Sequence, residues 1–258
     1  MRFYDFMIRC VGVPLFGHIL HARLTNAQAI PREGPVILAA NHLGGMDVLV
    51  VAALIERPIV YPAKAELFQG RGVKRLLGWW LRKMGQVPID RSGGRASADG
   101  LRPLVEVLAA GGVVGIFPEG TRSPDGRLYR GHTGVGRLAL ATGAPVIPLG
   151  MNRTHARPGF LGFPTMRDAQ IEFGSPIEFP APSGQQADAA AVRRATDQIM
   201  AGIQQITGQS YVDVYASRVK SGALDAATVE TFVRSRPGEP EPCPPASVDT
   251  DPVSGTAV

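Results

Sequence analysis

The chain alternates short runs of apolar residues with longer stretches in which apolar residues recur three and four positions apart. Short apolar runs bounded by turn residues are typical of buried strands, and the three-and-four spacing is typical of helices that bury one face. The runs that predict strands are residues 36–40, 59–61, 87–89, 113–117, 146–149 and 170–179. The stretches that predict helices are residues 48–55, 73–84, 101–110, 135–142 and 187–206. This alternation predicts an α/β fold, in which helices flank a largely parallel sheet.

The first 24 residues are rich in Phe, Ile, Leu and Val, but the apolar run is interrupted. A membrane-spanning helix needs about 20 predominantly apolar residues, whereas Arg9 and Pro14 break this run. The pattern therefore predicts two short amphipathic helical pieces, hinged near Pro14, within an N-terminal segment of residues 1–29. Two interpretations stay open: the pieces cap the globular core, or they lie in the plane of a membrane with their arginines toward lipid phosphates.

The main domain is predicted to span residues 30–233, followed by a tail of residues 234–258 that is rich in Pro, Glu and Ser. Such a composition buries too little apolar surface to order itself, so we expect a disordered acidic tail. The two cysteines, Cys10 and Cys243, lie far apart in the sequence. They do not form a disulfide framework or a zinc motif, which is typical of a protein from a reducing compartment.

Composition and charge narrow the classes of partner. Of the 258 residues, 45% are hydrophobic and 19% are charged, which suffices to bury a full core and excludes global disorder. The net charge is +5, but residues 237–258 hold four acidic and no basic residues, so the rest of the chain carries +9. A basic body with an acidic tail indicates an anionic partner: nucleic acid, a membrane surface or a phosphorylated substrate.

The first candidate for chemistry is a His–Asp pair, His42 and Asp47, directly after the first predicted strand of the main domain. In parallel α/β sheets, ligands bind at the carboxyl ends of strands. Residues five apart on an ideal helix point about 140° away from each other, so the pair meets only if a loop bends between them. Gly44-Gly45 supplies that freedom. Asp47 would then fix the imidazole tautomer and make His42 a competent general base; the alternative is a surface histidine and a helix-capping aspartate.

Three further blocks follow strands or lie in them. Pro118-Glu119-Gly120-Thr121-Arg122-Ser123 brings an acid, a hydroxyl and a guanidinium to the same predicted sheet edge as His42, a combination that can bind phosphate. Taken alone, this block is more typical of a solvated turn. Residues 85–91 place Arg91 just after a short apolar segment, and residues 146–149 form a buried strand that contains a proline.

Together and in this order, the four blocks resemble the glycerolipid acyltransferase family, the lysophosphatidate (1-acyl-sn-glycerol-3-phosphate) acyltransferases. The family's His-x4-Asp block matches His42 and Asp47, and its Phe-Pro-Glu-Gly-Thr-Arg-Ser block matches residues 117–123 without a mismatch. Its Val-Ile-Pro block matches residues 146–148. Its Gly-x-x-Phe-Ile-x-Arg block matches residues 85–91, with Pro88 in place of the usual Phe. The resemblance covers roughly residues 30–152.

The resemblance implies transfer of a fatty acyl group from acyl-CoA or acyl carrier protein to the free sn-2 hydroxyl of 1-acylglycerol 3-phosphate, which gives phosphatidate in phospholipid biosynthesis. It implies His42 as the base and Asp47 as its orienter, with no metal and no cofactor beyond the acyl thioester. The residues that it implies for binding the acceptor's phosphate are Lys64, Arg91, Glu119, Gly120, Thr121 and Arg122. Those that it implies for contact with the acyl chain or donor are Ile147 and Pro148.

Both tryptophans, Trp79 and Trp80, lie together between Lys74-Arg75 and Arg82-Lys83. Paired Trp bracketed by basic residues suits a membrane interface, whereas the other interpretation packs the rings on the sheet or along an acyl-chain groove. We expect a peripheral or monotopic protein at the cytoplasmic face of a membrane, with no nucleic acid partner. The alternatives are a sibling acyltransferase that accepts another lysophospholipid or a glycolipid, and a non-enzymatic basic protein that binds membrane surfaces or nucleic acid.

Overall fold

The computed structural model of the protein describes residues 6–69, 72–83, 85–89, 100–154, 157–158, 164–165, 168–180 and 187–239. Arg91, one of the predicted phosphate-binding residues, lies outside these ranges, and so does the predicted tail from residue 240 onward.

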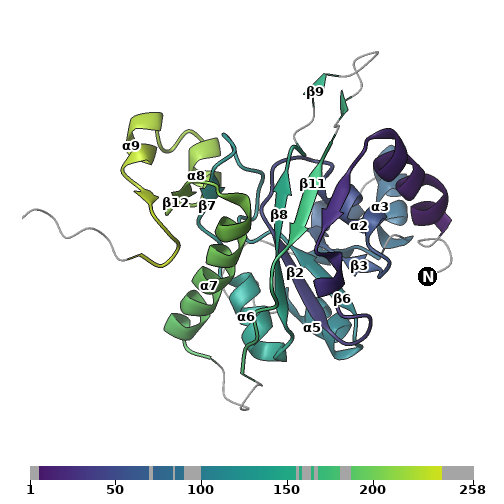
Figure 1. The fold of residues 1–258 in the computed structure, drawn as a ribbon, viewed down its shortest axis with the longest axis horizontal. Coiled ribbons are helices and arrows are strands. Elements are labelled where there is room, and N and C mark those ends of the chain that lie inside the picture. The colour runs from purple at the N-terminus through teal and green to yellow at the C-terminus, as the bar shows by residue number, and fades with distance from the viewer. Residues whose placement is uncertain are drawn as a thin grey trace, which may run out of the picture.

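A six-stranded sheet forms the centre of the molecule, with the strand order β1-β11-β8-β2-β6-β3 (Figure 1). Its strands are β1 (Arg23–Thr25), β2 (Val36–Ala40), β3 (Ile59–Val60), β6 (Val113–Ile116), β8 (Val146–Asn152) and β11 (Gln170–Phe173). β2 runs parallel to both β6 and β8, β3 is parallel to β6, and β1 is parallel to β11. Only the β11–β8 pairing is antiparallel in this sheet. The predicted α/β class with a largely parallel sheet is confirmed.

Successive residues of β2 supply two hydrophobic cores, one on each face of the sheet. Val36, Leu38 and Ala40 pack into the first core, and Ile37 and Ala39 pack into the second. This follows from the alternation of side chains along a strand. Because both faces are covered, the strand reads in the sequence as a continuous apolar run.

Helices cover both faces of the sheet (Figure 1). The first core takes side chains from η1 (Ile8–Ile19) and α2 (Asp47–Leu54). The second takes side chains from α5 (Arg102–Ala109), α6 (Gly134–Thr142) and α7 (Ala189–Thr207). α7 begins with an N-cap, in which the Asp188 carboxylate accepts a hydrogen bond from Ala191 N, and it ends at Gly208 in the left-handed conformation.

The N-terminal helix η1 continues through Pro14, so the predicted hinge was wrong. Proline breaks an α-helix because its ring clashes with the carbonyl four residues earlier. η1 is instead wound as a wider π-helix, whose bonds reach five residues back, as Leu20 N does to Leu15 O. η1 packs tightly on α2, since a Cβ added at Gly12 would lie 2.9 Å from Ala53 Cβ. Within the described part of the chain, no helix is both long and apolar enough to cross a membrane.

A C-terminal segment after α7 forms a small layer beside the main sheet. It comprises β12 (Tyr211–Val212), α8 (Ala216–Lys220), α9 (Ala226–Glu230) and β13 (Val233–Arg234). β12 pairs in parallel with β7 (Leu128–Tyr129) and antiparallel with β13. The described chain runs on to Glu239, whose carboxylate accepts from Ser235 N, so it extends past the predicted start of the tail at residue 234.

Shorter elements complete the description. β4 (Pro62–Lys64) pairs in parallel with β5 (Val87–Ile89), and the connection between them holds η3 (Ala65–Phe68) and α3 (Val73–Lys83). η2 (Ala27–Ala29) lies between β1 and β2 in the chain, and β9 (Arg157–Pro158) and β10 (Pro164–Thr165) form an antiparallel pair.

Candidate active site

The predicted pair of His42 and Asp47 meets in the structure. β2 ends at Ala40, so His42 lies just beyond the carboxyl end of a central strand, and Asp47 is the first residue of α2. His42 Nδ1 lies 2.8 Å from Asp47 Oδ2. The Asp47 side chain is fully buried, whereas that of His42 is 19% exposed. With Nδ1 engaged, the ring offers Nε2 as its second nitrogen for proton transfer.

The Asp47 carboxylate also shapes the loop that carries His42. The same oxygen, Oδ2, accepts hydrogen bonds from Leu43 N at 2.8 Å and from Gly44 N at 2.9 Å. Oδ2 is therefore held by three partners: the imidazole Nδ1 and two backbone N–H groups. Glycine is required at position 44 by lack of space and not by an unusual backbone conformation. Its φ is not positive, whereas a Cβ there would clash with Thr154 O.

The ring of His42 is held from the side by an aromatic stack. It lies on Phe117, with 4.2 Å between ring centroids and an interplanar angle of 22°. Phe117 in turn stacks on Tyr61 at 5.7 Å. These contacts fix the plane of the imidazole, because the hydrogen bond to Asp47 alone leaves rotation about that bond.

Glu119 holds the backbone of His42. Glu119 is buried, its Oε2 accepts from His42 N at 2.9 Å, and its Oε1 accepts from Tyr129 N at 2.9 Å. His42 O accepts from Ser123 N at 2.7 Å, so both backbone polar groups of His42 are bound by the 119–123 loop. Burial raises the pKa of Glu119 to about 7, against the lowering effect of the two backbone hydrogen bonds. The geometry shows a positioning role for this carboxylate; its phosphate-binding role stays a prediction.

Strand register explains why Glu119 meets His42. Ala39 pairs with Ile116 in the parallel ladder of β2 and β6. His42 and Glu119 each follow this pair by three residues, so they leave the sheet edge side by side. Parallel strands in register carry equivalent residues to the same edge.

The turn after Glu119 faces the same edge of the sheet. Gly120 has a φ of 71°, a value that glycine adopts readily. Thr121 is half-buried and Arg122 is exposed. Arg122 Nη1 lies 3.8 Å from the position that a Cβ would occupy at Gly45. The guanidinium of one motif therefore lies over the His42–Asp47 loop of the other.

Of the remaining predicted site residues, two are buried in a central strand, and two lie wholly or partly outside the described part of the chain. Ile147 and Pro148 lie in β8, both buried, in register with Leu38 and Ala39 of β2. Ile147 belongs to the first core, so its contact with an acyl chain or donor stays a prediction. Lys64 ends β4, but its side chain, like all of Arg91, lies outside the part of the chain that the structure describes.

One basic residue at the site was not predicted from the sequence. Lys220, the last residue of α8, places its Nζ 3.3 Å from Thr121 Oγ1. The two residues are 99 positions apart, so no local motif could have linked them. A parallel pairing of β12 with β7 brings α8 to this edge, and two-residue strands such as these carry little sequence signal.

Comparison with known proteins agrees with this geometry. Residues 21–152 match the family model described as Acyltransferase, which is half of the chain. The chain belongs to the acyltransferase family. The match includes the His42–Asp47 loop and the 117–123 loop, whereas the C-terminal segment lies beyond it.

Named relatives of this acyltransferase include two 1-acyl-sn-glycerol-3-phosphate acyltransferases. The chloroplastic BAT2 protein of Brassica napus is 33% identical over 117 residues, which are 45% of this chain and 33% of that protein. The Bacillus subtilis protein is 31% identical over 128 residues, 49% of this chain and 60% of that protein. The chain thus matches less than two thirds of the length of either relative.

A solved structure shares the fold. The crystal structure of the 1-acyl-sn-glycerophosphate acyltransferase PlsC from Thermotoga maritima aligns with a TM-score of 0.57 at 24% identity. The alignment covers 80% of this chain and 78% of that one. At this identity the likeness concerns the arrangement of the chain rather than its substrates.

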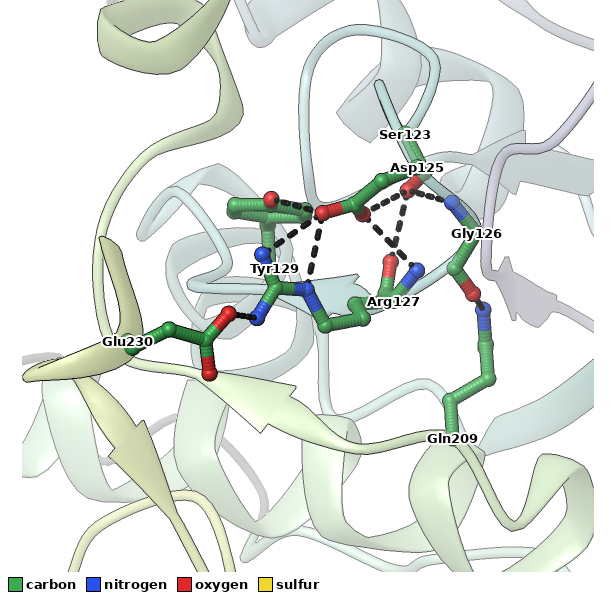
Figure 2. Close-up of polar contacts among 7 residues, drawn as sticks. All are labelled: Ser123, Asp125, Gly126, Arg127, Tyr129, Gln209 and Glu230. Atoms are coloured by element: carbon green, nitrogen blue, oxygen red, sulfur yellow. Dashed lines mark hydrogen bonds and ion pairs between the residues drawn. The ribbon is translucent and has the colours of Figure 1, made fainter. Parts of the chain in front are cut away.

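A polar network ties the active-site loops of the acyltransferase to its C-terminal segment (Figure 2). Arg127 donates to Asp125 and to Glu230, both at 2.7 Å. The Tyr129 hydroxyl donates to Asp125 at 2.9 Å, and Gln209 donates to Gly126 O.

The same network reaches the residue before His42. Asn41 is fully buried and donates to Gln209 Oε1 at 2.9 Å and to Met151 O at 3.0 Å. The side-chain amide oxygen of Asn41, Oδ1, accepts from Met151 N at 2.7 Å. Buried polar groups with all partners in place make a loop rigid, so the position of His42 depends on β8 and on the C-terminal segment as well as on its own loop.

Proposed function

We propose that this acyltransferase moves a fatty acyl group from an acyl thioester to the free sn-2 hydroxyl of 1-acylglycerol 3-phosphate. The observation that carries the proposal is the 2.8 Å contact between His42 Nδ1 and the buried Asp47 carboxylate at the carboxyl end of β2, with Arg122 beside it. The names of the relatives support the same acceptor. The donor is acyl-CoA or acyl carrier protein.

The acceptor hydroxyl is the nucleophile in this reaction. An alcohol attacks poorly at neutral pH, so a base must take its proton in the transition state. His42 Nε2 takes the proton while the hydroxyl oxygen bonds to the thioester carbonyl carbon. When the carbon–sulfur bond breaks, the imidazolium returns the proton to the departing thiolate. Asp47 stabilises the imidazolium between these two steps, and such proton transfer contributes about 10²–10⁴-fold to the rate.

The phosphate of the acceptor binds at the Gly120–Arg122 turn in this proposal. A guanidinium matches two phosphate oxygens at once, and a hydroxyl adds a further donor. Arg91 and Lys64 would add positive charge, as the family resemblance implies. A phosphate-free acceptor would lose these contacts, which separates a lysophosphatidate acyltransferase from a sibling that uses a neutral lipid.

The lipid substrates place the enzyme at a membrane surface. Along α3 and η3, Leu76 is 64% exposed, Trp79 is 48% exposed and Leu67 is 42% exposed. Just before η1, Phe6 is 60% exposed. Both regions lie at the end of the molecule opposite the C-terminal segment (Figure 1). Apolar and aromatic side chains flanked by exposed cations are typical of peripheral membrane contact, so η1 serves both earlier interpretations: one face caps the core and the other meets lipid.

The direct test is acyl transfer by the purified protein. Labelled acyl-CoA or acyl carrier protein is supplied with 1-acylglycerol 3-phosphate in neutral detergent micelles, and phosphatidate is measured for the wild type, His42→Ala and His21→Ala. His21 is an exposed histidine outside the motif, 21 positions earlier in the chain, and serves as the matched control. Loss of product with His42→Ala alone supports the proposal. Full activity of a folded His42→Ala protein would disprove the assigned base, and equal rates with monoacylglycerol would favour a sibling acyltransferase.

A further inference from the structure

The C-terminal segment contacts the Gly120–Arg122 turn through Lys220. Lys220 Nζ lies 3.3 Å from Thr121 Oγ1. The position of α8, which carries Lys220, is fixed by Tyr215 directly before it. The Tyr215 ring stacks on His132 with 4.3 Å between centroids, and His132 N donates to Pro118 O just before the turn. This packing fixes the helix that carries Lys220 beside the turn, and the exposed lysine side chain reaches Thr121 from there.

Three arginines near this segment have carboxylate partners. Arg127 pairs with Asp125 and Glu230, Arg130 with Asp213, and Arg193 with Asp197. Arg122 and Lys220 differ from these three arginines in their surroundings. Among the residues that the structure describes, neither has a carboxylate within ion-pair distance.

These two cations also repel each other. Desolvation lowers the pKa of Lys220, the neighbouring Arg122 guanidinium lowers it further, and the Glu119 carboxylate opposes both effects. Glu119 is not their direct partner: among the described residues no ion pair joins it to either cation, and its two oxygens accept from His42 N and Tyr129 N. Like charges held together without an anion are unfavourable, and an anion bound between them removes the repulsion.

We propose that Lys220 binds the phosphate of the lysolipid acceptor together with Thr121 and Arg122. This assignment rests on the proposed function and adds to it a binding residue outside the region that matches the acyltransferase family model. An ammonium group has three donors, so the contact with Thr121 leaves two for phosphate oxygens. The fork of Arg122 and the point charge of Lys220 together offset the charge of a phosphate monoester.

The test compares two substitutions that remove the same charge from the same helix. Lys220→Met removes the proposed ligand. Arg218→Met is the matched control: Arg218 is exposed, lies two residues earlier on α8 and so points about 200° away. KM and kcat for 1-acylglycerol 3-phosphate are measured in neutral detergent micelles, so that lipid charge does not contribute. Lys220→Arg tests whether a cation at this position restores binding.

We expect Lys220→Met to raise KM for the lysophosphatidate about 10- to 100-fold, the loss typical of a hydrogen bond to a charged group, with kcat within about twofold. Arg218→Met should leave KM unchanged, and Lys220→Arg should recover most of the loss. With monoacylglycerol, which lacks the phosphate, the wild type and Lys220→Met should react at equal rates. An unchanged KM for Lys220→Met, or an equal rise for Arg218→Met, would overturn the assignment.

A binding measurement separates this inference from the proposed function. Glycerol 3-phosphate is titrated into the wild type and Lys220→Met by calorimetry, with no acyl donor present. If the wild type acylates no lysophospholipid but binds glycerol 3-phosphate at least tenfold more tightly than Lys220→Met does, the function is wrong and the anion site stands. If the wild type acylates lysophosphatidate and both proteins bind glycerol 3-phosphate equally, the function stands and Lys220 is not a ligand.

Discussion

Replacing Glu119 by Gln tests whether a buried carboxylate holds the two active-site loops together. In the wild type each carboxylate oxygen accepts one backbone hydrogen bond, from His42 N and from Tyr129 N. A glutamine has one oxygen and one amide group, so one of the two backbone N–H groups then faces a donor. A protonated Glu119 has the same limitation because one of its oxygens carries the proton. Glu119→Gln therefore mimics the protonated acid at every pH.

The stability effect follows from the pKa of Glu119, which burial raises from its ordinary 4.5 to about 7. Because the folded pKa lies above the unfolded one, the protonated side chain contributes stability that is fully present below pH 4.5 and is lost as the pH rises through about 7. At about 1.36 kcal/mol per pH unit, the difference corresponds to roughly 3 kcal/mol. The free energy of unfolding of the wild type should fall by this amount relative to Glu119→Gln between pH 4.5 and pH 7, and the difference should stay constant above that range.

Activity should move in the opposite direction. The ionised carboxylate accepts both backbone N–H groups, and leaving one of them unpaired costs about 1–3 kcal/mol. If that loss falls on the position of His42, the wild type should exceed Glu119→Gln in kcat by about tenfold or more above pH 8. The two proteins should converge below about pH 6, with little difference in KM.

The assay is kcat and KM for lysophosphatidate from pH 5.5 to 8.5, with unfolding followed in denaturant from about pH 4.5 to 8.5, the range over which Glu119 titrates. Glu178→Gln, at an exposed glutamate, is the control for loss of a negative charge. A ratio of kcat values that does not change with pH would refute the reasoning, and a loss confined to KM would favour direct contact of Glu119 with the acceptor.

Three further variants, two single and one double, test the site and the membrane surface. Asp47→Asn should lower kcat by about 10²–10⁴-fold with little change in KM, because a neutral amide does not stabilise the imidazolium; a kcat within threefold of wild type would contradict the role of the carboxylate. Gly44→Ala should lower both Tm and kcat, since its Cβ would lie 2.2 Å from Thr154 O, with a destabilisation of about 1–3 kcal/mol. Leu76→Asp with Trp79→Asp should reduce cosedimentation with anionic vesicles while leaving activity in detergent micelles intact, and unchanged cosedimentation would place the membrane contact elsewhere.

The sheet was predictable because its central strands are buried on both faces. β2 lies at the residues that its apolar run indicated, and β6 and β8 differ from their predicted runs only at their ends. The contact of His42 with Asp47 was also predictable, since it joins two residues of one loop. In both cases the information is local, so the sequence alone carries it.

Long-range contacts and helix winding were not predictable in the same way. η1 passes through Pro14 because it packs on α2, a tertiary contact that outweighs the local tendency of proline to break a helix. Glu119 is 77 residues from His42. Lys220 is 99 residues from Thr121. Such contacts depend on which strands are neighbours in the sheet and on the register of their pairing. Neither can be deduced from a single sequence.

Register, once known, makes the contact between the two loops a consequence of the sheet. Ala39 and Ile116 are partners in the β2–β6 ladder, and three residues beyond each stand His42 and the glutamate that binds its backbone. One loop therefore positions the other through the sheet and not through a flexible contact between side chains. Adding or removing one residue between Ile116 and Glu119 would leave the apolar strands paired and both motifs intact as sequence, yet it would move the carboxylate about 3.3 Å along the strand direction. The hydrogen bond to His42 N, at 2.9 Å, does not survive such a shift, so the length of this connection is as necessary to the active site as the residues at its ends.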